Sequence, residues 1–201
     1  VPPAETRQSL GIPADALVVG SVTRLSEQKD PLTLIDALAQ VHQARPGVWS
    51  VIVGDGALRP QVEARIAHYG LTGRILLTGL RRDVPELMSA FDVFVLSSLW
   101  EGLPRVLPQA MATGLPIICT RADGSAEAIT NGINGFLVEP QSAEKIAKKA
   151  ILLIDDDNLR RNMGAAGKKQ VAMFDARKMV QDIDQLYTSF LKQKNESDFD
   201  R

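Results

Sequence analysis

Two polar residues eight positions apart, Glu101 and Gln109, carry the clearest chemical signal in the sequence. Glu101 lies in a loop after the apolar run 93–96, and Gln109 lies in the amphipathic stretch that follows. A carboxylate accepts hydrogen bonds, and an amide both accepts and donates them, so the pair suits a ligand rich in hydroxyl groups. On spacing alone, a helix-capping glutamate and an ordinary surface glutamine explain the two residues equally well.

The residues directly after Glu101 add backbone groups to this candidate site. Pro104 suits the first turn of a helix, where its missing N–H is not needed. Gly102 is expected to let the backbone approach a ligand closely. The N–H groups of Gly102 and Leu103 are predicted to remain available for an anionic or hydroxylated group.

Two cations stand at the start of another predicted helix. Arg24 and Lys29 come shortly before Asp30, a good N-cap residue, and Pro31, which suits a first helical turn. A helix start offers free N–H groups and partial positive charge, so with these cations it would suit a diphosphate. Taken alone, the loop is more simply explained by two solvated surface cations.

Two further loops carry weaker signals. The run 54–56, Gly-Asp-Gly, lacks the rest of a dinucleotide-binding fingerprint and is better explained as a tight turn. In the second loop, Asp83 is expected to cap a short helix and Arg81 to be exposed to solvent. The backbone of Leu80 and Arg81 could pair with a flat heterocycle on this rim, although nothing local requires it.

Short apolar runs alternate with amphipathic stretches along most of the chain, which predicts parallel strands with helical crossovers. The fold class is therefore α/β, a doubly wound, Rossmann-like parallel sheet with helices on both faces. Ligands of such sheets bind beyond the carboxyl ends of the strands, where the loops above should meet. The expected strands are 16–22, 48–53, 74–78, 93–96, 116–120 and 135–138, and the expected helices are 31–44, 58–69, 84–91, 104–113, 125–131, 143–154, 158–173 and 176–192.

The composition limits the class of protein. The chain has 201 residues, 45% of them hydrophobic, and a net charge of −1, so nothing draws the domain to nucleic acid. Residues 1–193 are predicted to form one domain and 194–201 a loose charged tail. The start, Val1-Pro2-Pro3, is expected to be a cut inside a longer protein, and no apolar run is long enough to cross a membrane.

The remaining reactive side chains have structural explanations. Cys119 lies in an apolar run and is expected to be a buried thiol on a strand. His42 and His68 lie in amphipathic helices away from the loops, and surface or partly buried placement is expected for both. No cluster of Cys, His, Asp and Glu has the spacing of a metal site, and no nucleophile elbow or Walker A loop is present.

Together, these loops resemble the C-terminal, donor-binding half of retaining glycosyltransferases of family 4 (glycosyl transferases group 1), which have the GT-B fold. The resemblance covers about residues 16 to 190. It depends on motifs that occur in this order: 24–25 with 28–30, 53–56, 78–84, 98–104, 110–116 and 131–138.

The resemblance assigns a catalytic role to Arg24, Lys29 and Glu101. It implies that Arg24 and Lys29 hold the diphosphate of a nucleotide sugar. It also implies that Glu101, with the backbone of Gly102 and Leu103, holds and orients the sugar rather than attacking it.

The resemblance places the nucleoside further along the same rim. It implies that position 109 holds the ribose and that the backbone near Leu80 and Arg81 holds the base. Two departures from the family pattern bear on this site. Gln109 replaces a glutamate, which loses a charge-assisted hydrogen bond and could shift donor preference, and Thr23 replaces a glycine and could crowd the phosphate loop.

The resemblance further implies retaining transfer of a glycosyl group from a UDP- or GDP-sugar to an acceptor hydroxyl, in cell-surface polysaccharide or lipopolysaccharide synthesis. The nucleotide sugar is a substrate, and no metal or other cofactor is expected. The acceptor would bind an N-terminal domain missing here, so this fragment should not transfer sugar alone. The full protein is expected in the cytoplasm, with any membrane contact at the inner face through the missing half.

Two alternatives remain open from the sequence. The first is a nucleotide-sugar epimerase of the same fold, which would need no acceptor. The second is a non-catalytic binding or assembly module, for which Gln109 would be a sign of lost activity.

Overall fold

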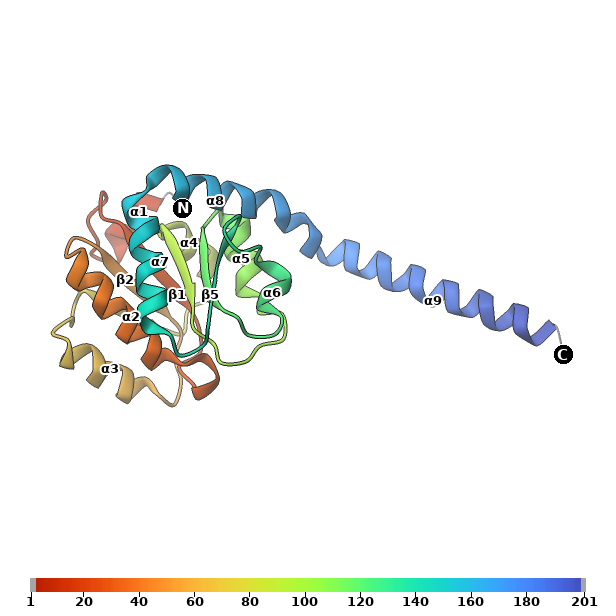
Figure 1. Ribbon diagram of the computed structural model, residues 1–201, viewed down its shortest axis with the longest axis horizontal. Coiled ribbons are helices and arrows are strands. Elements are labelled where there is room, and N and C mark those ends of the chain that lie inside the picture. The colour runs from red at the N-terminus through yellow and green to blue at the C-terminus, as the bar shows by residue number, and fades with distance from the viewer. Residues whose placement is uncertain (1–2, 200–201) are drawn as a thin grey trace.

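A parallel sheet of six strands forms the centre of the computed structural model, which describes the backbone of residues 3–199 and the side chains of residues 3–191 (Figure 1). The strand order is β3-β2-β1-β4-β5-β6. The strands are β1 (Val18–Val22), β2 (Trp49–Val53), β3 (Ile75–Gly79), β4 (Val93–Leu96), β5 (Ile117–Thr120) and β6 (Gly135–Val138). The order reverses direction between β1 and β4, and this places their carboxyl-terminal loops side by side.

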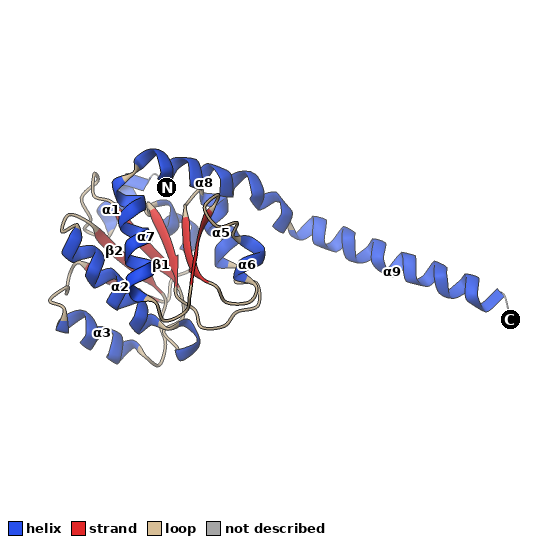
Figure 2. Ribbon diagram, in the orientation of Figure 1, coloured by secondary structure: helices blue, strands red, loops and turns tan. Residues whose placement is uncertain are grey.

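Helices cover both faces of the sheet, which confirms the predicted fold class (Figure 2). One face carries α2 (Pro31–Ala44), α3 (Arg59–His68) and α7 (Ala143–Asp155), and the other carries α1 (Pro3–Ser9), α4 (Val84–Ser89), α5 (Val106–Thr113) and α6 (Ser125–Ala128). Helix α8 (Asp157–Gln170) contacts both α7 and α5, and short 3-10 turns occur at η1 (Glu27–Lys29) and η2 (Val171–Phe174).

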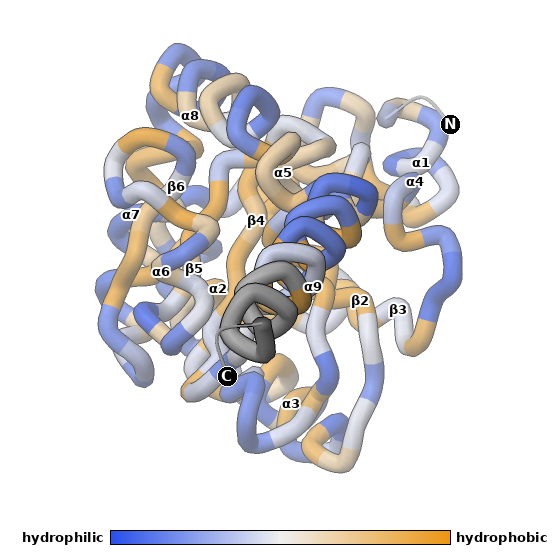
Figure 3. The backbone as a smooth tube through the Cα atoms, turned by 90° about the vertical axis from the view of Figure 1, so that its right-hand side faces the viewer, coloured by the Kyte–Doolittle hydropathy of each residue, from blue (hydrophilic) through white to orange (hydrophobic). Residues whose placement is uncertain are grey.

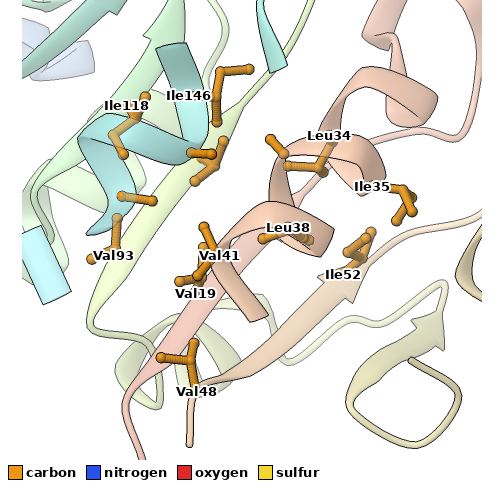
Figure 4. Close-up of a cluster of buried hydrophobic side chains, with 14 of the residues drawn as sticks. Val19, Leu34, Ile35, Leu38, Val41, Val48, Ile52, Val93, Ile118 and Ile146 are labelled. Carbon is orange, nitrogen blue, oxygen red and sulfur yellow. The ribbon is translucent and has the colours of Figure 1, made fainter. Parts of the chain in front are cut away.

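Successive strand residues point to opposite faces, so the central strands are mostly apolar, and β4 (VFVL) is apolar throughout. In β4, Val93 and Val95 pack under α2 and α7, whereas Phe94 and Leu96 pack under α4 and α5. Figure 3 shows this strand as hydrophobic along its length. Figure 4 shows Leu34, Leu38 and Val41 of α2 packed above the first of these faces.

The first helix, α1, was not predicted from the sequence. Helix α1 has one buried residue, Thr6, and therefore no apolar periodicity that could predict it. Arg7 holds it in place by donating to the Ala90 carbonyl oxygen at 2.9 Å and to the Asp92 carboxylate at 2.8 Å. These partners are more than eighty positions away in the chain, so local sequence could not reveal them.

The last helix, α9 (Ala176–Phe199), projects away from the body of the molecule (Figure 1). Residues 175–191 are all exposed. An apolar stripe runs along α9 at helical spacing, made up of Met179, Val180, Ile183, Leu186, Tyr187, Phe190 and Leu191. The helix also extends to Phe199, through most of the segment expected to be a loose tail, and residues 200–201 lie outside the described part.

Helix α6 is shorter than predicted, because it ends at Ala128 rather than at position 131. No helix within the described residues is long and apolar enough to cross a membrane.

Candidate functional site

The loops after β1, β2, β3 and β4 enclose a cavity of about 640 Å³ at the carboxyl edge of the sheet. Five of the eight predicted catalytic and substrate-binding residues line it: Arg24, Lys29, Leu80, Arg81 and Glu101. The other lining residues are Val22, Thr23, Gln28, Val53, Gly54, Asp55, Val84, Pro104, Arg105 and Val106. The sequence-based expectation that Arg24 and Glu101 share one rim is therefore met in the structure.

The loop that carries Arg24 is held against the end of β2. Thr23 donates its N–H to the Val53 carbonyl oxygen at 2.9 Å, and Leu25 donates to the Asp55 carbonyl oxygen at 3.0 Å. A Cβ atom on Gly54 would lie 1.9 Å from the Thr23 carbonyl oxygen, and the φ of Gly54 is +136°. The expected tight turn at 54–56 is wrong, because Gly54 pairs with Gly79 and the turn follows Gly56, whose carbonyl oxygen accepts the Arg59 N–H at 3.0 Å. Glycine is still required at position 54, where it lets two loops touch.

Glu101 and Lys29 form an ion pair at the cavity wall. The two carry side-chain exposures of 7% and 19%, so both charges are largely withdrawn from water. Ser98 donates its hydroxyl to the same Glu101 oxygen, Oε1, at 2.7 Å. Sequence reasoning assigned Lys29 and Glu101 to different parts of a ligand and missed their contact, which joins positions 72 apart.

Hydrogen bonds tie the Lys29 loop to the Glu101 loop. Leu99 donates its N–H to the Gln28 carbonyl oxygen at 2.8 Å, and the Gln28 amide donates to the Trp100 carbonyl oxygen at 3.0 Å. The Ser97 hydroxyl donates to the Lys29 carbonyl oxygen at 2.8 Å. Because β1 and β4 are neighbours, these two loops form one continuous wall.

Helix α2 begins as predicted. Asp30 occupies the N-cap and accepts a hydrogen bond from the Thr33 N–H at 3.3 Å, and Pro31 is the first helical residue. Asp30 has a φ of 44°, a left-handed conformation uncommon outside glycine. The Ser97 hydroxyl also contacts the Asp30 carbonyl oxygen at 3.0 Å, which helps hold this turn.

The side chain of Arg24 is exposed and forms neither a hydrogen bond nor an ion pair in the described part of the chain. Arg105 is a lining residue that sequence reasoning missed, and its side chain is likewise exposed and without a partner among the described residues. Its place directly after Pro104, the last residue of the motif 98–104, was the signal that could have found it. Thr23, expected to crowd this loop, is buried, and its hydroxyl contacts the Arg24 carbonyl oxygen at 3.4 Å.

Arg81 is exposed, as expected, but the predicted capping role of Asp83 is wrong. Asp83 stands at the N-cap position of α4, yet its side chain makes no capping hydrogen bond. Its carboxylate instead accepts from Arg81 Nε at 2.8 Å. This contact with the guanidinium lowers the pKa of Asp83.

Three of the proposed ligand-binding residues stand outside the cavity lining. Gly102 and Leu103 are exposed, and Gln109 is exposed in α5, about a turn beyond the lining residues Arg105 and Val106. The glycine that the packing requires at this loop is Gly124, where a Cβ atom would lie 2.1 Å from the Gly102 carbonyl oxygen. The roles predicted for Gly102, Leu103 and Gln109 stay predictions.

The histidines and the cysteine lie away from the cavity lining. His42 is buried in α2 with Nε2 3.0 Å from the Ser50 hydroxyl oxygen, and burial together with Arg74 lowers its pKa to about 4. Cys119 is buried on β5, as expected, and burial raises its pKa to about 12. Within the described residues, no three His, Cys, Asp or Glu side chains are grouped to hold a metal ion.

Residues 3–170 match the family described as "Glycosyl transferases group 1". The chain is 33% identical over 179 residues to the lipopolysaccharide core biosynthesis glycosyltransferase LpsE of Rhizobium meliloti (strain 1021), covering 89% of this chain and 52% of LpsE. It is 34% identical over 188 residues to the UDP-Gal:alpha-D-GlcNAc-diphosphoundecaprenol alpha-1,3-galactosyltransferase of Escherichia coli, covering 92% of this chain and 49% of that enzyme.

The fold is similar to that of Anabaena Alr3699/HepE solved in complex with UDP. The TM-score is 0.86 and the identity is 32%, over 93% of this chain and 52% of HepE. HepE has also been solved in complex with UDP-glucose, with a TM-score of 0.86 and 31% identity to this chain. The chain spans about half the length of these relatives. The family match, the relatives and the parallel sheet with its loop-lined cavity agree, and the chain belongs to the glycosyl transferases group 1 family, whose fold is GT-B.

Proposed function

We propose that this chain is the donor-binding half of a retaining glycosyltransferase, and that its cavity binds a nucleoside diphosphate sugar. The observation that carries the proposal is the meeting of Arg24, Lys29 and Glu101 in one cavity at the carboxyl edge of the sheet. Cations suit a diphosphate, and a carboxylate suits sugar hydroxyl groups.

UDP is the nucleotide that we favour over GDP. The HepE structures contain UDP or UDP-glucose, and the Escherichia coli relative is named for UDP-Gal. Because two relatives are named for lipopolysaccharide core or diphosphoundecaprenol-linked sugar transfer, we place the whole protein in the synthesis of lipopolysaccharide or a related cell-surface polysaccharide.

The chemistry that we propose is transfer to an acceptor hydroxyl with the anomeric configuration kept. Arg24 and Lys29 would stabilise the negative charge that develops on the departing diphosphate, without a metal ion or other cofactor. Glu101 would orient the sugar, and the leaving phosphate would help to deprotonate the acceptor. Gly102 and Leu103 would add backbone donors to the sugar, Gln109 would meet the ribose, and the backbone near Leu80 and Arg81 would meet the base.

We propose that the acceptor binds a second half of the protein, which corresponds to the part of the relatives that this chain does not span. The uncovered apolar stripe of α9 suits contact with that half. Transfer would then need both halves, in the cytoplasm, with any attachment to the inner face of the membrane made through the second half.

Calorimetry of this chain with UDP and with GDP tests the proposal. We expect UDP to bind, and we expect Arg24→Ala to weaken UDP binding by about 1.5–3 kcal/mol, the range of a hydrogen bond to a charged group. Arg82→Ala is the matched control, because Arg82 is an exposed neighbour of the rim that does not line the cavity. Equal UDP affinity in the wild type and in Arg24→Ala would remove Arg24 from the site.

The two alternatives predict different outcomes. A non-catalytic assembly module should bind neither nucleotide at millimolar concentration. An epimerase should convert its nucleotide sugar without an acceptor, which product analysis of the full-length protein detects, whereas the transferase should release nucleoside diphosphate only when an acceptor is present.

A further inference from the structure

The carboxylate of Glu101 is held by one of its two oxygens. Oε1 accepts the hydroxyl of Ser98 at 2.7 Å and also pairs with the ammonium of Lys29. Oε2 takes part in no hydrogen bond or ion pair among the described residues. Oε2 is also not fully buried. Since Glu101 lines the cavity, Oε2 is the carboxylate oxygen that remains free for a ligand.

Ser98 holds Glu101 from inside the protein. Its exposure is 0%, and it is not one of the residues that line the cavity. Its backbone is fixed as well, because the hydroxyl of Thr120 on β5 donates to the Ser98 carbonyl oxygen. Ser98 therefore cannot touch a cavity ligand, and any effect that it has on one must pass through Glu101.

The terminal torsion of a glutamate has a broad, roughly two-fold profile, so its carboxylate turns easily unless a partner fixes it. Without Ser98, both oxygens of Glu101 could turn towards Lys29. The ammonium of Lys29 has three donors, and one of them is used by Glu101 Oε1, which leaves others for a phosphate oxygen.

We propose that Ser98 is a positioning residue for the sugar part of the donor. By holding Oε1, it keeps Oε2 directed at a sugar hydroxyl, whereas Lys29 has donors left for the diphosphate with or without Ser98. The inference rests on the proposed function, because it requires a nucleotide sugar in the cavity. It assigns to Ser98 an effect on the sugar and none on the nucleotide.

The test is calorimetry of this chain with UDP and with UDP-glucose, UDP-galactose and UDP-N-acetylglucosamine. If the wild type binds GDP rather than UDP, the ligands are GDP and GDP-mannose. For the sugar that binds most tightly, we expect Ser98→Ala to lower affinity about tenfold, as for the loss of a hydrogen bond to a charged group. Affinity for the free nucleoside diphosphate should change by less than about twofold. A merely structural role of Ser98 would instead weaken the binding of both ligands.

Two variants support the comparison. Ser89→Ala is the matched control, because the Ser89 hydroxyl donates to the Glu86 carbonyl oxygen at 2.6 Å in α4, away from the cavity lining. It should change neither affinity. Ser98→Cys retains a weak donor of similar size and should give an intermediate loss, so it keeps the test open if Ser98→Ala does not fold.

The outcomes separate the inference from the proposed function. Failure of the wild type to bind any nucleoside diphosphate overturns the proposed function, and the inference with it. If the nucleotide binds but none of the sugars changes its affinity, the sugar role of Glu101 Oε2 is wrong. If Ser98→Ala weakens nucleotide and nucleotide sugar equally, or neither, Ser98 is not a positioning residue.

Discussion

At the residue scale, charge neutralisation divides the cations that line the cavity into two kinds. Lys29 and Arg81 have carboxylate partners within the protein, whereas Arg24 and Arg105 have none among the described residues. An unpartnered guanidinium keeps its full attraction for an anion and can bind a phosphate in a bidentate manner. This difference is why Arg24 is the residue whose removal best tests diphosphate binding.

A second prediction at the residue scale concerns Gln109. Gln109→Glu should tighten UDP binding about three- to tenfold, because a carboxylate accepts a stronger hydrogen bond from a ribose hydroxyl than an amide does. Calorimetry with UDP and with 2′-deoxy-UDP measures the gain, which should shrink with the deoxy ligand. No change with either nucleotide would show that position 109 does not meet the ribose.

At the scale of elements, the accuracy of sequence prediction follows the range of the interactions. Helix α2 begins and ends where predicted because Asp30 and Pro31 mark its start locally. Strands β4 and β6 also match, since each is a short apolar run between turns. Helix α1 was missed because the contacts of Arg7 that hold it come from residues distant in sequence.

The accuracy of prediction for the candidate site also depends on the range of the interactions. The sequence placed Arg24, Lys29 and Glu101 on loops at one edge of a parallel sheet, which needs only the alternation of strands and helices. The pairing of Lys29 with Glu101 depends on β1 lying beside β4. Strand order is a tertiary property that the pattern of one strand does not contain.

His42 connects α2 to β2 and gives that contact a pH dependence. Its pKa is lowered to about 4 in the folded protein, against about 6.5 in an unfolded chain. As the pH falls from about 6.5 to 4, the unfolded chain binds a proton that the folded protein excludes. The free energy of unfolding should therefore fall by about 2 kcal/mol across this window, after allowance for partial solvent screening.

Urea unfolding at pH 7 and at pH 4.5 measures this effect. His42→Gln should reduce the pH dependence, and His68→Gln, at an exposed position, should leave it as in the wild type. An identical loss of stability in His42→Gln and in the wild type would assign the pH dependence to other groups.

At the scale of the whole molecule, α9 contributes little to the body of the fold. Its amphipathic pattern predicted a helix correctly, but the pattern alone does not show whether a partner covers the apolar stripe. Deletion of residues 176–201 should change the free energy of unfolding by less than about 1 kcal/mol, because the described side chains of this segment are all exposed. Thermal and urea unfolding of the shortened chain provide the measurement.

Deletion from residue 156 onward is the contrasting variant. It also removes α8, where a Cβ atom on Gly164 would lie 1.9 Å from the Gly114 carbonyl oxygen, so this helix is in close contact with the end of α5. A large loss of stability is expected only from this longer deletion. A comparable loss from removal of α9 alone would mean that α9 packs on the body in solution.

The hydrogen bonds between Gln28 and the segment 99–100 have a consequence for motion. They tie together the two loops that form one wall of the cavity, and both loops continue from neighbouring strands of one sheet. A ligand that enters therefore meets a preorganised surface, and binding costs little entropy for ordering these two loops. These two loops should therefore move together with the sheet, and neither should open independently of the other.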